Sequence, residues 1–132
     1  LGPPDGATSR PDVFTNDALT PRPFCAPLSE AEQADYADRV ARRDPGLVRW
    51  YPPMGLAQVA RAQRAAAELE GAAYWDWSAR MGGPCSSHAL VTADPPRMRS
   101  DHLHFNSEGG AWIGDLLFAD LMATAPAVAG AR

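Results

Sequence analysis

The residues with the clearest chemical potential are Asp101 and His104, in the stretch Asp101-His102-Leu103-His104. In a tight loop, an Asp three residues before a His can turn its carboxylate onto the Nδ1 proton of the imidazole. That contact fixes the tautomer and stabilises the imidazolium while Nε2 faces a nucleophile. The spacing therefore predicts a catalytic dyad in which Asp101 orients His104, the general base. The alternative is a helix N-cap region with surface histidines.

Two further histidines compete for the role of general base. His88 follows Cys85-Ser86-Ser87, and we interpret it as a solvated loop histidine, with substrate contact as the alternative. The side chain of His102 should point away from that of His104 if the loop is extended. Replacement of His102 is then expected to cost little more than a surface change, and the base is assigned to His104.

The two cysteines, Cys25 and Cys85, lie in Pro- and Gly-bearing segments without the periodicity of a buried helix face. They favour a disulfide, which for so long a loop would stabilise the fold by about 4 kcal/mol in the chain-entropy model. A disulfide also implies an oxidising compartment. Two free thiols in a cytosolic protein are the alternative. Neither cysteine has a His at zinc-ligand spacing, so no metal site is expected.

Length and composition limit the class of protein. The chain has 132 residues, of which 45% are hydrophobic, and this is enough for one domain and too little for two. The net charge is -4, and all 12 basic residues are scattered arginines, so a nucleic-acid partner is not expected. No window approaches the roughly 18 consecutive apolar residues of a membrane span. We expect no cofactor.

Two helices are predicted in the first half of the chain. Residues Ser29 to Glu32 form a capping box that opens a helix, which runs through about Arg43 to an Asp-Pro-Gly stop. A second helix begins within residues 53–56 and ends at Leu69, before a capping Gly71. Its small-residue face is expected to pack close against a sheet.

The second half predicts a strand and a last helix. Residues 72–77, Ala-Ala-Tyr-Trp-Asp-Trp, indicate a short aromatic strand, followed by a polar, Pro-rich loop over 78–100. Asn106-Ser107-Glu108 caps the last helix. One face of that helix holds Trp112, Ile113, Leu116, Leu117, Asp120 and Leu121. Residues 5–27 hold four prolines and predict an irregular loop, with Asn16-Asp17 as a turn.

Helices alternating with a strand are typical of the second half of a three-layer α/β/α sandwich. Ligands of such sheets bind beyond the carboxyl ends of the strands. That rule would place residues 76–83 and the Asp101 loop on the same side of the sheet as a site. Within the first of these segments, Met81 and Gly82 are candidate substrate contacts.

The stretch from Asp101 to Met122 resembles the last conserved block of SGNH/GDSL hydrolases: Asp, two residues, His, an apolar residue, a cap region, Gly and a Leu-rich helix. Leu1-Gly-Pro-Pro-Asp is similar to the end of the strand after that family's Gly-x-Asn-Asp block. Residues 73–84 are similar to the last strand and loop of bacterial polysaccharide and peptidoglycan O-acetylesterases. The chain departs from the pattern at Gly110, commonly an aromatic, and at His102, frequently Gly.

The resemblance implies the C-terminal portion of a flavodoxin-like sandwich with a parallel sheet. It also implies a triad whose serine lies in a Gly-Asp-Ser motif, with Asp101 and His104 supplied here. Neither Gly-Asp-Ser nor Gly-x-Asn-Asp occurs in residues 1–132. The expected partner is therefore an N-terminal fragment of the same hydrolase, and Leu1, which opens on a strand-like tail before two prolines, is interpreted as a cut point.

The function implied is that of a bacterial, periplasmic or secreted serine esterase. It would remove O-acetyl groups from a carbohydrate such as peptidoglycan or another polysaccharide, through an acyl-enzyme. An O-acetyltransferase would use the same residues to pass the acyl group to a sugar hydroxyl. A non-catalytic carbohydrate-binding module that keeps the fold is the alternative from another class.

Overall fold

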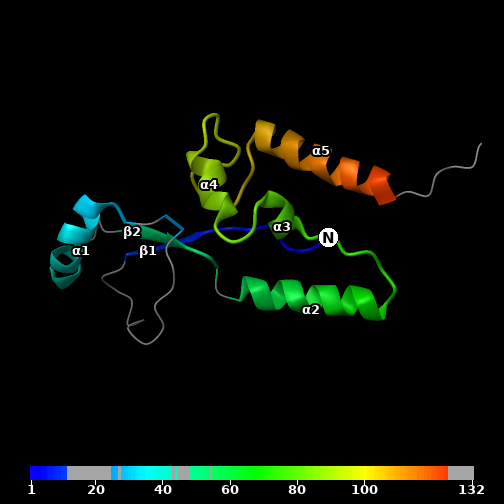
Figure 1. The fold of residues 1–132 in the computed structure, drawn as a ribbon, viewed down its shortest axis with the longest axis horizontal. Coiled ribbons are helices and arrows are strands. Elements are labelled where there is room, and N and C mark those ends of the chain that lie inside the picture. Colours follow the sequence, from blue (N-terminus) through cyan, green and yellow to red (C-terminus); the bar gives the residue numbers. More distant parts are fainter. Residues whose placement is uncertain (12–24, 27, 43, 45–47, 54, 125–132) are drawn as a thin grey trace, which may run out of the picture.

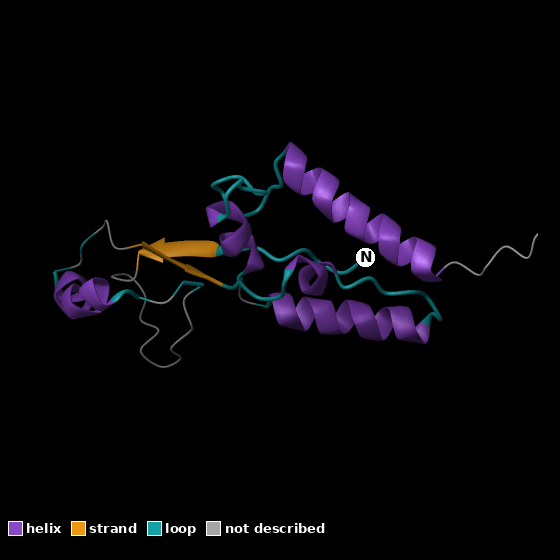
Figure 2. Cartoon of the chain, turned by 45° about the horizontal axis from the view of Figure 1, so that its top comes forward, coloured by secondary structure: helices purple, strands orange, loops and turns teal. Residues whose placement is uncertain are grey.

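The computed structural model describes residues 1–11, 25, 26, 28–42, 44, 48–53 and 55–124, and its structure is mixed α/β, as the sequence predicts. Within these ranges the elements are β1 (Thr8–Pro11), α1 (Glu30–Ala41), β2 (Val48–Tyr51), α2 (Leu56–Leu69), α3 (Trp77–Met81), α4 (Ser86–Thr92) and α5 (Ser107–Thr124). In Figure 1, α1 and the strands form one end of the molecule, and α2 and α5 lie on either side of α3 at the other. Figure 2 shows the same division from a second direction.

Helix α1 begins at the predicted capping box. The Ser29 hydroxyl accepts a hydrogen bond from the Glu32 amide at 3.2 Å, and the Glu32 carboxylate accepts one from the Ser29 amide at 2.9 Å. These two bonds satisfy backbone donors that the first turn leaves unpaired. An ion pair of 3.3 Å between Arg49 and Glu32 joins the helix to β2. The prediction of this helix is confirmed.

Strands β1 and β2 form an antiparallel pair, with Thr8 opposite Tyr51 and Pro11 opposite Val48. The sequence analysis did not predict them, and β1 lies in the segment expected to be a loop. Four-residue strands are too short to show a period, and the pairing depends on a partner about 40 residues away. These two strands form the one sheet found among the described residues. The parallel three-layer sandwich therefore stays a prediction. Asn16-Asp17 lies outside those residues.

Helix α2 is confirmed, together with the left-handed Gly71 (φ 64°) that follows it. None of its residues is buried, and the expected sheet beneath its small-residue face is not found in the described structure. The helix instead contacts the following segment, where the Tyr74 hydroxyl donates to the Ala60 carbonyl at 3.3 Å. Alanine side chains bury little area, so this packing is shallow.

The strand predicted over residues 72–77 is not present. The segment makes one backbone hydrogen bond to the N-terminal residues, from the Gly2 amide to the Trp75 carbonyl at 2.7 Å. A single backbone hydrogen bond does not make a strand pair. The segment also ends in a helix start, because the Asp76 side chain caps α3 by accepting from the Ala79 amide at 3.0 Å. The expected loop over 78–100 contains α4 and all of α3 except its first residue. Its polar, Pro-rich composition is typical of a loop, but parts of it form short helices.

The core lies between α3 and α5. Met81, Met98 and Ile113 are buried at its centre. Partly buried apolar residues surround them: Trp75, Trp77, Leu90, Val91, Phe105, Trp112 and Leu116. An isolated bridge between Met98 and Phe105 closes the loop that carries Asp101 to His104, so the core fixes both ends of that loop. Neither α5 nor any other helix in the described ranges is long and apolar enough to cross a bilayer.

Helix α5 starts at the predicted cap and only partly follows the predicted face. The Asn106 side chain accepts from the Gly109 amide at 2.8 Å, which confirms the cap. Ile113 is buried, but Phe118, Leu121 and Met122 are more than half exposed. The last two turns therefore extend beyond the core of the described structure.

Candidate active site

Asp101 and His104 form the predicted pair. The Asp101 Oδ2 atom lies 2.9 Å from His104 Nδ1. The other oxygen, Oδ1, accepts from the backbone amides of Leu103 at 2.9 Å and His104 at 3.0 Å. Because an ionised carboxylate only accepts, Nδ1 carries the proton and the neutral imidazole presents a basic Nε2. The geometry thus has the arrangement that a general base needs from its orienting residue.

These bonds keep Asp101 ionised. The Leu103 amide, the His104 amide and then the His104 side chain hold the pKa of the Asp101 carboxyl well below its ordinary value. Hydrogen bonds to the charged form of a group always favour that form. At neutral pH the carboxylate can therefore stabilise a positive charge on His104 during proton transfer.

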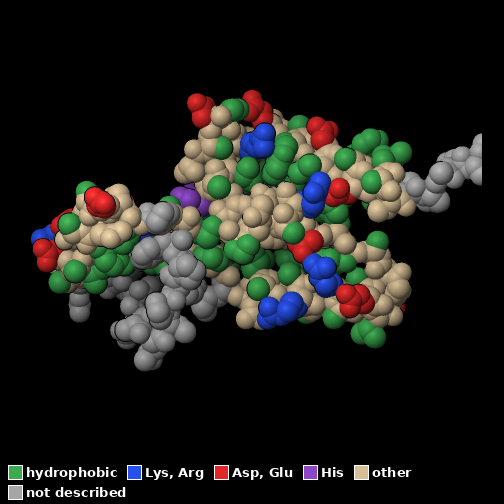
Figure 3. Space-filling view, in the orientation of Figure 1, with side chains coloured by type: hydrophobic (Ala, Val, Ile, Leu, Met, Phe, Trp, Pro, Cys, Tyr) green, Lys and Arg blue, Asp and Glu red, His purple; other side chains and the backbone are tan. Residues whose placement is uncertain are grey.

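The dyad is open to solvent. The side chain of His104 is 69% exposed and that of Asp101 is 45% exposed. Figure 3, which colours every histidine purple and labels none, shows histidine surface where the α1 end of the molecule meets the remaining helices. In the described part of the chain, the imidazole of His104 has Asp101 as its one side-chain partner. Nε2 is accordingly free to contact a group that does not belong to these residues.

His102 differs from the sequence expectation. It is 4% exposed, so it is not a surface residue, and the backbone at this position is not extended but left-handed (φ 60°). Its ring stacks on Trp50 with 3.5 Å between centroids. Its Nδ1 lies 2.9 Å from the Ser100 carbonyl and its Nε2 lies 3.0 Å from His88 Nδ1. Replacement of His102 is therefore no longer expected to resemble a surface change.

His88 is also not a solvated loop residue. It lies in α4, is half-buried, and faces His102. Burial, and secondarily the neighbouring His102, lower the pKa of His88 from its ordinary value of 6.5. The neutral form of His88 is therefore favoured in the folded protein.

Cys25 and Cys85 form the predicted disulfide, with 5.1 Å between their Cα atoms. Cys25 also donates its backbone amide to the Trp50 carbonyl at 2.8 Å. Cys85 is the residue immediately before α4, in a left-handed conformation (φ 69°). The bridge therefore connects the segment beside β2 to the start of the helix that carries His88.

The two candidate substrate contacts differ in accessibility. Met81 is 5% exposed in the core, and its sulfur accepts the Asp5 amide at 3.3 Å. Gly82 is exposed and has a positive φ of 120°. A ligand at this loop would meet the backbone of Gly82 rather than the side chain of Met81. Their role in substrate binding stays a prediction.

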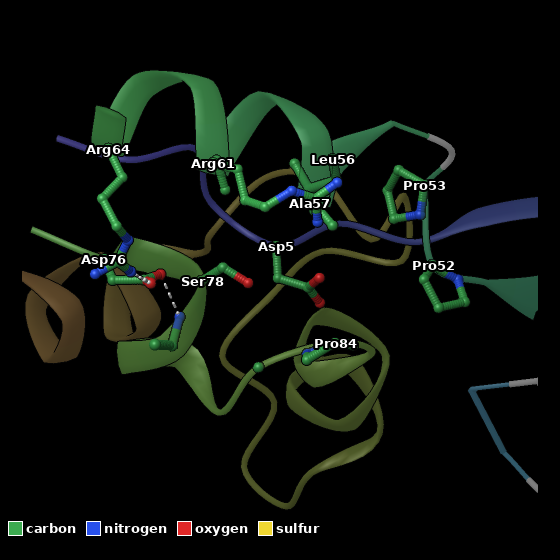
Figure 4. Close-up of a pocket in the computed structure, with 13 residues that line it drawn as sticks. Asp5, Pro52, Pro53, Leu56, Ala57, Arg61, Arg64, Asp76, Ser78 and Pro84 are labelled. Carbon is green, nitrogen blue, oxygen red and sulfur yellow. Dashed lines mark hydrogen bonds and ion pairs between the residues drawn. The ribbon is translucent and has the colours of Figure 1, made fainter. Parts of the chain in front are cut away.

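A pocket of about 360 Å³ lies between α2 and the loop after α3 (Figure 4). Apolar residues of α2 and the preceding prolines form one wall, and the Arg64–Asp76 ion pair lies at one end. Asp5 lines it, held by bonds from the Ser86 hydroxyl at 3.2 Å and the Ser87 amide at 3.0 Å. Neither Asp101 nor His104 is among its lining residues, so the pocket and the dyad are separate features.

Two residues at or near the site were missed by the sequence analysis. Asp5, which ends the stretch Leu1-Gly-Pro-Pro-Asp but was given no role, is buried, and Trp50, which stands in a stretch without a recognisable motif, covers His102. No pattern within the sequence pairs Trp50 with a residue 52 positions later. No group of three or more potential metal ligands is found among the described residues.

Comparisons with protein-family models, with curated proteins and with solved structures find no match for this chain. The resemblance to SGNH/GDSL hydrolases therefore stays a prediction.

Proposed function

We propose that this chain supplies the Asp and His of a Ser-His-Asp esterase site, in an SGNH-type hydrolase that removes O-acetyl groups from a carbohydrate. The observation that carries the proposal is the Asp101–His104 contact of 2.9 Å, with His104 exposed and its Nε2 free. The nucleophilic serine would come from an N-terminal fragment of the same hydrolase, because the Gly-Asp-Ser motif is absent from residues 1–132.

In the proposed reaction, His104 Nε2 takes the proton of the serine hydroxyl as the oxygen attacks the acetyl carbonyl. The Asp101 carboxylate stabilises the imidazolium. That proton then passes to the departing sugar oxygen, which leaves an acetyl-serine. His104 next removes a proton from water, the resulting attack releases acetate, and the serine regains its proton.

The two serines that precede His88 in α4 do not provide the nucleophile. Ser86 and Ser87 are buried, and the Ser86 hydroxyl and the Ser87 backbone amide both donate to Asp5. A buried hydroxyl cannot reach an ester bound at the exposed His104. This supports a nucleophile from another segment.

The disulfide supports an oxidising compartment, in keeping with a periplasmic or secreted enzyme acting on a cell-wall or extracellular polysaccharide. Of the two candidate substrate contacts, Gly82 is retained in the proposal through its exposed backbone, whereas the side chain of Met81 is buried in the core.

The test is hydrolysis of p-nitrophenyl acetate by residues 1–132 alone and by the protein completed with its Gly-Asp-Ser segment. We expect turnover from the completed protein only. In that protein, His104→Ala should lower kcat by several orders of magnitude, because it removes the general base. His88→Ala is the matched histidine control and should retain far more activity. Near wild-type kcat in a folded His104→Ala variant would overturn the proposal, and turnover by residues 1–132 alone would overturn the divided triad.

A further inference from the structure

We propose that His102 is a positioning residue, whose buried ring locks the left-handed turn that presents the Asp101 carboxylate to His104. The inference deepens the proposed function and rests on it. It assigns a task to a residue that the sequence pattern alone places on the surface.

The backbone at residue 102 is the first step. A φ of 60° is unfavourable for a residue with a Cβ atom, so it persists only where surrounding contacts determine it. The turn is closed by hydrogen bonds from the His102 amide to the Arg99 carbonyl at 3.0 Å and from the Arg99 amide to the His104 carbonyl at 2.8 Å. It is this turn that aims the amides of Leu103 and His104 at one Asp101 oxygen.

The ring of His102 is held on three sides. Trp50 stacks on one face, the Ser100 carbonyl lies 2.9 Å from Nδ1, and His88 lies 3.0 Å from Nε2. The Ser100 carbonyl can only accept, so Nδ1 of His102 carries a proton and donates to it, and Nε2 shares a hydrogen bond with His88 Nδ1. Every polar atom of the ring is then satisfied, and the ring cannot act as a base toward His104.

Two of these contacts, from Trp50 and from His88, are linked through a backbone hydrogen bond and the Cys25–Cys85 disulfide. Trp50 belongs to β2 and His88 to α4, elements that are far apart in the chain. Cys25 is hydrogen-bonded to the Trp50 carbonyl at 2.8 Å, and its disulfide partner Cys85 stands directly before α4. The disulfide and the Cys25–Trp50 hydrogen bond therefore connect the two segments that contact the His102 ring.

The experiment measures the titration of the Asp101 carboxyl by carbon-13 NMR in the full chain, with Asp101→Asn to assign the signal. In the wild type the pKa should lie well below the ordinary value of 3.8. In His102→Ala it should rise toward 3.8, by about half a unit or more, because the turn loosens its amide bonds. Trp50→Ala should give a shift of the same sign. Leu69→Ala, at an exposed position on α2, is the control and should give no shift.

His102→Gly keeps the test valid if His102→Ala does not fold. Glycine adopts φ 60° without strain but makes none of the ring contacts, so its Asp101 pKa should also rise. In the completed protein, His102→Gly should lower kcat about tenfold or more with little change in KM, since the orientation of the base and not substrate binding is altered.

An Asp101 titration in folded His102→Gly and Trp50→Ala that coincides with the wild type would overturn the proposal. A shifted titration without esterase activity in any form of the protein would count against the proposed function and leave the control of Asp101 by His102 standing. The two failures are thus distinguishable.

Discussion

Position 102 holds a histidine where glycine would meet the backbone requirement without strain. A glycine reaches φ 60° without steric cost because it has no Cβ atom. His102 is held at this angle by its burial and by three contacts of its ring. The two solutions differ in rigidity, because a fixed ring leaves the turn one conformation. At the scale of single residues, the geometry of the Asp101–His104 contact therefore depends on the side chain of His102, which is not a member of the dyad.

The Asp101 carboxylate is expected to be essential in the completed protein. In Asp101→Asn the amide can donate to His104 Nδ1, which moves the imidazole proton to Nε2 and removes the base. The corresponding loss in a Ser-His-Asp triad is about 10⁴-fold in kcat. Steady-state kinetics measure it, with Asp115→Asn on the exposed side of α5 as the control. A mild effect would show that Asp101 does not have the role assigned here.

His88 makes folding stability depend on pH. Its pKa is lowered in the folded state, so the unfolded chain binds more protons as the pH falls. Its contribution is complete above 6.5, the unfolded value, and is lost as the pH falls through the lower folded pKa. We expect Tm to decrease between pH 7.5 and 5, and to decrease less in His88→Gln. Equal slopes for both proteins in calorimetry would contradict this.

At the scale of elements, α5 packs against the loop that precedes it through Gly109. A Cβ atom at this position would overlap the Arg97 carbonyl oxygen, whereas one at Gly110 would meet nothing within 4 Å. Gly109→Ala should therefore destabilise the protein by about 2 kcal/mol or more, through overpacking. Gly110→Ala should stabilise it by up to about 1 kcal/mol, since Ala is the better helix former. Urea denaturation compares the two, and similar midpoints would refute the packing given for Gly109.

Helices α1, α2 and α5 were predictable because their signals are local, whereas the short α3 and α4 were not predicted. Ser29 with Glu32, Gly71 and Asn106 each mark a helix end within a few residues, and each is found there. The aromatic run 72–77 has strand-forming residues, but a strand exists only with a partner, and one bond from Gly2 does not make a ladder. Strands β1 and β2 were missed for the converse reason, since their pairing lies outside any local window.

In the candidate site, too, only the contact between residues close in the sequence was predictable. Asp101 and His104 are three residues apart, so their contact is a local property. The ring contacts of His102 with Trp50 and His88 bring together residues from three separate segments. Burial of His102 follows from that assembly, and its own neighbours in sequence carry no sign of it.

At the scale of the whole molecule, the disulfide is the strongest link between its two ends. Ellman's reagent should find no thiol in unreduced, denatured protein, because both cysteines are bridged. Cys25→Ser with Cys85→Ser should lower the free energy of unfolding by up to about 4 kcal/mol, as expected for a closed loop of this length. Ala26→Ser, at an exposed position next to Cys25, is the control that introduces a serine and keeps the bridge. Unchanged stability of the double variant would show that the bridge constrains little.

The same bridge makes residues 25–85 a closed covalent ring. A protease nick inside the ring opens the backbone without releasing a piece, since both fragments stay attached through sulfur. Trypsin can cut only after arginine in this lysine-free chain, and Arg61 and Arg64 are exposed on α2 within the ring. Protein nicked there migrates in denaturing electrophoresis as one band without reductant and as two after reduction. Electrophoresis without reductant therefore does not detect cleavage within residues 25–85, which are almost half of the chain.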